Sequence, residues 1–120
     1  MQTFITSYDF AETAQSLDSK RLNKQLLEGR QILNILATGR QTGGWVNHPA
    51  VRMWHGYERM FYNYLVAIKD ECVHRGISVD VNWQAIEELM RRGSYNFGPN
   101  LVEPWWYVDR EMLLRIIQTH

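Results

Sequence analysis

The segment from residue 19 to residue 37 most constrains the fold, because its apolar residues follow the period of an α-helix. At about 100° per residue, four leucines form one apolar stripe: Leu22, Leu26, Leu33 and Leu36. Such a helix has to bury its stripe against other elements, so the sequence predicts a core built around this segment. Gly29 costs the helix about 1 kcal/mol relative to alanine. A glycine in this position often permits the close approach of another backbone or of a ligand.

Shorter runs of the chain show the same period. We predict helices over residues 10–16, 19–37, 49–74, 83–92 and 110–118. Aromatic residues recur at helical spacing in the third of these segments, which is more typical of a core than of a base-stacking platform. The sequence therefore predicts an all-α fold, with two long helices and several shorter ones in a single compact domain over residues 1–120.

The composition is that of an ordinary globular chain, with 45% hydrophobic and 22% charged residues. No apolar run approaches the ~18 residues of a membrane span, so we expect no membrane association. The first ten residues contain Asp9 and no basic run, so we expect no signal peptide. Cys72 is the only cysteine and cannot form an intramolecular disulfide. These features predict a reducing compartment, the cytoplasm.

The charges are unevenly distributed although the net charge is zero. Residues 20–59 contain seven lysines and arginines against two glutamates, whereas residues 70–90 contain five acidic residues against one arginine. A neutral protein with one basic half can present a phosphate-binding face. The alternative is a solvated mosaic of charges, and the charge pattern alone leaves both interpretations open.

One carboxylate stands out at the edge of the 19–37 stripe. Arg21, Lys24 and Gln25 precede Glu28 by seven, four and three residues, so all lie on one edge of the helix. We therefore expect Glu28 to be framed by two cations and an amide at the border between core and solvent. The simpler interpretation is a surface salt bridge between Lys24 and Glu28, which would stabilise the helix by a few tenths of a kcal/mol.

Other kinds of site find little support in the sequence. The four histidines do not follow zinc-ligand spacing, and no C-x-x-C motif is present. No nucleophile-elbow motif surrounds any serine. We therefore expect no metal and no cofactor.

Several segments together resemble the pyrimidine-dimer DNA glycosylases, the phage-type endonuclease V family, in a bacterial and phage branch. The segment Arg21-Leu22-Asn23-Lys24-Gln25-Leu26-Leu27-Glu28 resembles the first-helix segment that ends in the family's catalytic glutamate. Residues 67–77, AIKDECVHRGI, resemble the end of the second long helix and its arginine-glycine exit. Residues 45–54, WVNHPAVRMW, and the opening MQTF look like the same branch.

The resemblance implies a compact helical domain whose N-terminal segment is threaded between the long helices. It implies a DNA glycosylase with AP-lyase activity on damaged or modified pyrimidines in double-stranded DNA. By matching position, Glu28 is the catalytic acid and the α-amine of Met1 is the nucleophile, forming a Schiff base at C1′. Because Gln2 is bulky, we expect Met1 to be retained. The DNA-binding residues implied are Arg21, Lys24, Gln25, Arg30, Asn47, His48 and Arg52.

Two further hypotheses remain open. In the first, the chain is a non-enzymatic module that keeps this fold and binds a nucleic acid or a nucleotide. In the second, it is a helical interaction protein in which Glu28 has only a structural role.

Overall fold

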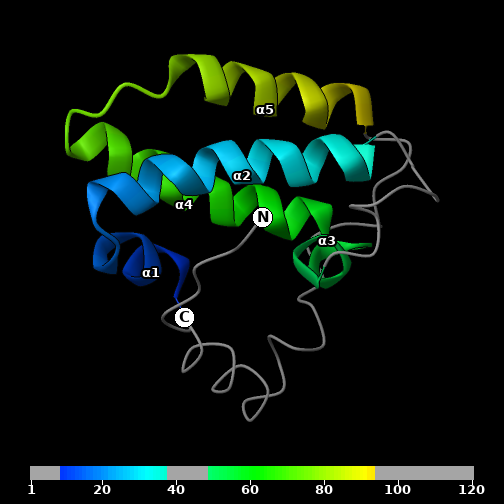
Figure 1. Ribbon diagram of the computed structural model, residues 1–120, viewed down its shortest axis with the longest axis horizontal. Helices are drawn as coiled ribbons and strands as arrows, with labels where there is room; N and C mark the ends of the chain where they lie inside the picture. Colours follow the sequence, from blue (N-terminus) through cyan, green and yellow to red (C-terminus); the bar gives the residue numbers. More distant parts are fainter. Residues whose placement is uncertain (1–8, 38–48, 94–120) are drawn as a thin grey trace, which may run out of the picture.

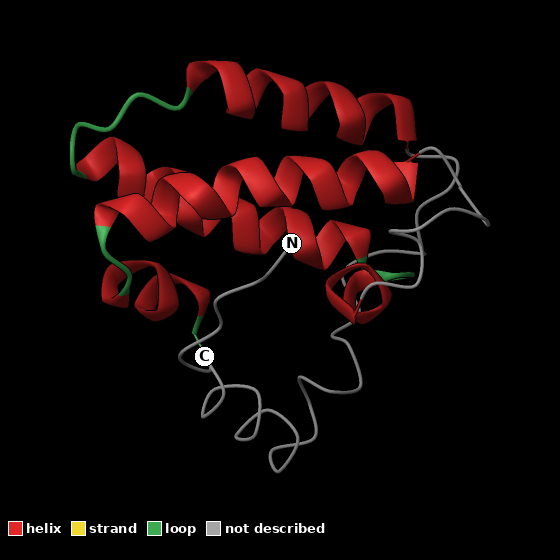
Figure 2. Ribbon diagram, viewed as in Figure 1, coloured by secondary structure: helices red, strands yellow, loops and turns green. Residues whose placement is uncertain are grey.

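The computed structural model describes residues 9–37 and 49–93, and these residues form five helices and no strand (Figures 1 and 2). The helices are α1 (Phe10–Ser16), α2 (Ser19–Ala37), α3 (Pro49–Trp54), α4 (Glu58–His74) and α5 (Asp80–Arg92). The predicted all-α class is confirmed. The single domain predicted over residues 1–120 extends beyond the described residues. The threaded N-terminal segment and the helix expected over residues 110–118 lie outside them.

Helix α2 is the element around which the described helices pack. It contacts α3, α4 and α5, while α1 packs on α4 (Figure 1). Helices α2 and α5 run in the same direction, and α4 runs the opposite way behind α2 (Figure 1). The four leucines of the predicted stripe are all buried, in one cluster with Trp54, Phe61 and Leu65. The stripe and the aromatic run therefore form the core, as the sequence predicts.

The first two helices begin where side chains cap them. The Asp9 carboxylate accepts hydrogen bonds from the backbone N–H groups of Ala11 and Glu12, and α1 follows. The Asp18 carboxylate accepts from the backbone N–H of Arg21 at 2.7 Å in the first turn of α2. These acceptors satisfy N–H groups that have no partner within the helix. The bounds predicted for both helices are confirmed.

The single helix predicted over residues 49–74 is wrong, because the chain turns between Trp54 and Glu58. Gly56 adopts a φ of 85°, a left-handed conformation that glycine adopts without steric cost. Its N–H donates to the Glu58 carboxylate at 2.9 Å, and Tyr57 N–H donates to the carbonyl of Trp54. The apolar spacing continues across the turn, since α3 and α4 both face the same core.

Helix α4 ends at His74, as predicted, and Gly76 follows the cap residue Arg75 with a φ of 77°. Helix α5 begins at Asp80 rather than at the predicted Trp83. Asn82, whose position before Trp83 would suit a helix cap, therefore lies inside the first turn. Gly93 caps its C-terminus, as predicted.

Helix α5 is also held to α4 by side chains. The Trp83 ring stacks on Tyr62 at a centroid distance of 5.7 Å, and Lys69 Nζ lies 5.2 Å from the centre of the Trp83 ring. The Tyr62 hydroxyl donates to Glu87. Burial, reinforced by this carboxylate, raises the pKa of Tyr62 to about 12.

Cys72 is fully buried on α4, and burial raises the pKa of its thiol. None of the helices in residues 9–37 and 49–93 has the length and apolarity needed to cross a bilayer.

Candidate active site

Glu28 lies in the middle of α2, at the edge of the buried stripe, and only 9% of its surface is exposed. Its Oε1 lies 3.9 Å from Nζ of Lys24, one turn earlier, whose side chain is 56% exposed. The carboxylate is therefore sheltered from bulk solvent, while its cationic neighbour extends outward. A sheltered carboxylate beside an exposed cation can exchange a proton or stabilise a developing positive charge.

Arg21 was expected beside Glu28, but its side chain contacts Asp18 instead. Its guanidinium pairs with Asp18 at 2.6 Å, one turn earlier, and both side chains are more than half exposed. The pKa of the Asp18 carboxyl is lowered, chiefly by the hydrogen bond from the backbone N–H of Arg21, which outweighs the opposing effect of burial. The charge and side-chain hydrogen bond of Arg21 and the charge of Lys20 lower it further. The expectation that Arg21 frames Glu28 is wrong, because Asp18 is the nearer acid on the same helix edge.

Gln25 is fully buried rather than exposed at the helix border. Its Oε1 accepts a hydrogen bond of 2.7 Å from the hydroxyl of Tyr64 on α4, which is also fully buried. No part of Gln25 reaches the surface, so its side chain is not available for the predicted contact with DNA.

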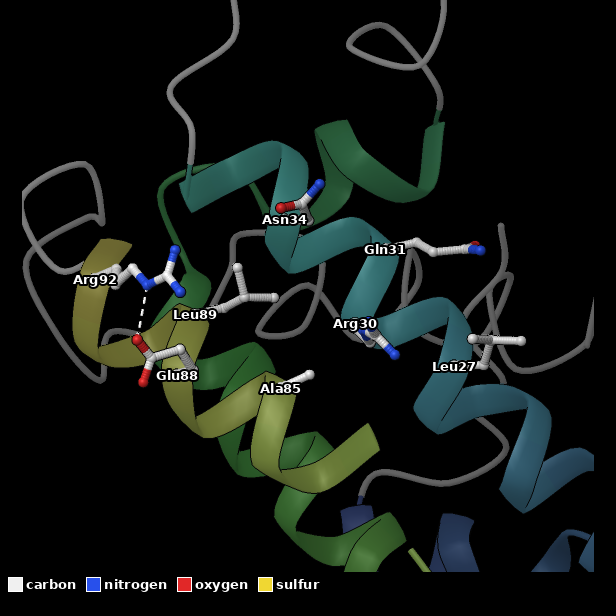
Figure 3. A pocket seen from close by; sticks show the side chains of 8 residues that line it. All are labelled: Leu27, Arg30, Gln31, Asn34, Ala85, Glu88, Leu89 and Arg92. Atoms are coloured by element: carbon white, nitrogen blue, oxygen red, sulfur yellow. Dashed lines mark hydrogen bonds and ion pairs between the residues drawn. The ribbon is translucent and has the colours of Figure 1, made fainter. Parts of the chain in front are cut away.

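Arg30 lies on the other flank of α2, facing α5. Its Nη1 donates a long hydrogen bond of 3.4 Å to Asn82 Oδ1. It lines an open groove of about 680 Å³ between the two helices (Figure 3). The other lining residues are Leu27, Gln31, Asn34, Ala85, Glu88, Leu89 and Arg92. At the α5 side of the groove, Glu88 pairs with Arg92, so part of the basic charge there is neutralised (Figure 3).

Two arginines flank the turn between α3 and α4. Arg52 is exposed on α3, and Arg59 is half-buried in the first turn of α4. Within the part of the chain that the structure describes, Arg59 Nε is buried and has no hydrogen-bond partner. Sequence reasoning counted Arg59 in the basic half but did not select it. Its position seven residues after Arg52, beside the aromatic stripe, is the signal that could have identified it.

Three predicted site residues, Met1, Asn47 and His48, lie outside the described residues. The placement of the Met1 amine near Glu28 therefore stays a prediction. Among residues 9–37 and 49–93, no group of three or more histidine, cysteine, aspartate or glutamate side chains is arranged to hold a metal ion.

Comparison with known proteins gives one informative result. The family model described as pyrimidine dimer DNA glycosylase matches residues 1–85, which include Glu28 and all of α1 to α4. No curated protein and no solved structure matches the chain.

Proposed function

The chain belongs to the pyrimidine dimer DNA glycosylase family, and we propose that it excises damaged or modified pyrimidines from double-stranded DNA and then acts as an AP lyase. The observation that carries this proposal is the environment of Glu28. It is a nearly buried carboxylate with an exposed lysine beside it, inside the segment that the family model matches. A DNA substrate also fits the predicted cytoplasmic location.

In the proposed reaction, the neutral α-amine of Met1 attacks C1′ of the damaged nucleotide. A bond forms between nitrogen and C1′ while the glycosidic bond breaks, and the base leaves with the electron pair and takes up a proton. Opening of the sugar ring then gives a Schiff base, and loss of a C2′ proton breaks the C3′–O bond by β-elimination. An α-amine suits this role, because its reference pKa of about 7.7–8.0 leaves a useful neutral fraction near pH 7.

Glu28 is the proposed acid–base group of this sequence. As a carboxylate it stabilises the cationic sugar that develops when the base departs. It also accepts and returns protons during ring opening and elimination. The shelter of the site supports this role, since electrostatic interactions are stronger where water is excluded.

Most of the proposed DNA contacts are basic side chains on α2, α3 and α4. Lys24 extends into solvent beside Glu28, and Arg52 is exposed on α3. Arg59 joins this set because a half-buried guanidinium with an unpaired nitrogen suits a phosphate oxygen. Arg21, Arg30, Asn47 and His48 complete the proposed contacts. Rotating the target nucleotide out of the duplex costs a few kcal/mol, and less for a damaged base.

The proposal is tested by borohydride trapping on duplex DNA that carries either an abasic site or a cyclobutane dimer. We expect a covalent adduct at the N-terminal peptide, identified by mass spectrometry. Glu28→Gln lowers the trapping rate by about 10²-fold or more. The matched control is Asp70→Asn, an exposed acid on α4, which keeps the wild-type rate.

Two outcomes contradict the enzymatic proposal. DNA binding that survives in Glu28→Gln, with no adduct formed by the wild-type protein, would instead support a binding module. Loss of the folded state in Glu28→Gln would indicate the structural role.

A further inference from the structure

The ring of Tyr64 is held by aromatic side chains from three helices. Phe10 of α1 packs edge-on against it at a centroid distance of 5.2 Å. Trp54 of α3 and Phe61 of α4 lie nearly parallel to it, at 5.9 Å and 6.1 Å. All but Phe10 are fully buried. Aromatic contacts on this scale fix the orientation of a ring, so the Tyr64 hydroxyl has a defined direction.

That hydroxyl is directed at α2. It donates to Gln25 Oε1 at 2.7 Å, across 39 residues of sequence and in the fully buried interior. A hydrogen bond between two buried side chains is strongly directional, because neither group has water as an alternative partner. It therefore fixes the position of the Gln25 side chain relative to α1, α3 and α4.

The same bond also orients the Gln25 amide. Because the oxygen faces Tyr64, the NH2 group is at the opposite end of the amide plane. Glu28 lies three residues further along α2, and side chains at this spacing are neighbours on a helix surface. The buried amide and the sheltered carboxylate thus share one edge of α2.

We propose that Tyr64 and Gln25 are positioning residues for Glu28, a role that rests on the proposed function above. The aromatic cluster fixes Tyr64, Tyr64 fixes Gln25, and Gln25 fixes the edge of α2 from which the Glu28 carboxylate reaches the reacting sugar. Neither residue touches DNA. Their effect is on the reaction rate, since a misplacement of ~1 Å at a reacting group can lower that rate by about 10²-fold.

The test separates reaction rate from binding and from folding. Tyr64→Phe removes only the hydroxyl. The matched control is Tyr62→Phe, which removes the hydroxyl that bonds to Glu87 on the α5 side of α4. For each protein, the single-turnover rate of borohydride trapping is measured on duplex DNA with an abasic site. The Kd is measured on the same duplex carrying an unreactive tetrahydrofuran analogue, and unfolding by urea reports stability.

We expect Tyr64→Phe to lower the trapping rate by about tenfold or more with a Kd within about twofold of wild type, because positioning acts on the transition state alone. Tyr62→Phe is expected to keep the wild-type trapping rate and the wild-type Kd. If Tyr64→Phe unfolds, the double variant Gln25→Met/Tyr64→Phe takes its place, because it removes the donor and the acceptor of this hydrogen bond together. It is expected to fold and still to react slowly.

Three results would overturn the proposal. A wild-type trapping rate in folded Tyr64→Phe, or in the double variant, would remove the positioning role and leave the proposed function standing. A parallel loss of rate and DNA binding would indicate a purely structural bond. Absence of any adduct with the wild-type protein would overturn the proposed function itself, and this proposal with it.

Discussion

Leu65 of α4 packs directly on the backbone of Gly29 in α2. A β-carbon built on Gly29 would lie 2.5 Å from Cδ2 of Leu65 and 3.0 Å from its Cδ1. The sequence predicts the close approach of a backbone or a ligand at this glycine, whereas the structure has a leucine side chain of a neighbouring helix there. Because Gly29 directly follows Glu28, the contact sets how deeply this part of α2 is embedded in the core.

We expect Gly29→Ala to destabilise the protein. Helix propensity favours alanine by about 1 kcal/mol, whereas overpacking against the fully buried Leu65 costs about 1–3 kcal/mol. The free energy of unfolding in urea measures the balance. Asn23→Ala, at an exposed position of α2, is the control that gains propensity without a clash. In a Leu65→Ala background the clash is gone, so Gly29→Ala becomes stabilising. If Gly29→Ala is as destabilising in the Leu65→Ala background as in the wild type, the clash with Leu65 is not the cause.

Asp18 is expected to stabilise α2 in a pH-dependent way. The pKa of Asp18 in the folded protein lies below its ordinary value of 3.8, so its charge contributes stability above that value, and this stability is lost as the pH falls through the folded pKa. Asp18→Asn keeps a side-chain acceptor for the helix start but not the charge. Urea midpoints measured from pH 2 to pH 7 are expected to differ between wild type and Asp18→Asn at pH 6 and to converge below the folded pKa. A difference that persists at pH 2 would refute the electrostatic contribution.

Arg59 is expected to contact a DNA phosphate. Replacing one phosphate-binding cation lowers the slope of log Kd against log salt concentration by about 0.9 for duplex DNA. We therefore expect Arg59→Met to bind an abasic-analogue duplex more weakly and with a smaller salt slope. Arg91→Met is the control, since Arg91 pairs with Glu88 on α5. Identical slopes for Arg59→Met and wild type would remove Arg59 from the interface.

The helices that local signals define were predicted well. The bounds of α1 and α2 follow from Asp9, Asp18 and the leucine stripe, all of which act within a few residues. The turn at Gly56 was missed because both flanking helices bury the same aromatic face, so the apolar period gives no sign of a break. The start of α5 was misplaced because Asp80 and Asn82 are both plausible first-turn residues, and Val79 precedes the helix without any side-chain cap.

The candidate site was predictable only along one helix. The spacing of Lys24 and Glu28 indicates their proximity, and the structure has them 3.9 Å apart. The partner of Gln25 lies on another helix, so no spacing within α2 could identify Tyr64. Arg21 lies three residues after Asp18 and seven residues before Glu28. Helical spacing alone grouped it with Glu28, whereas in the structure it pairs with Asp18.

Because α2 is packed on three sides, its residues divide into two groups with different freedom to change. Those facing α3, α4 and α5 cannot be exchanged without disturbing several neighbours at once. The exposed residues of α2 away from this packing, which include Lys20 and Asn23, carry no such constraint. Substitutions at these exposed positions can therefore change the charge of the surface around Glu28 while the Glu28 carboxylate stays at the same depth.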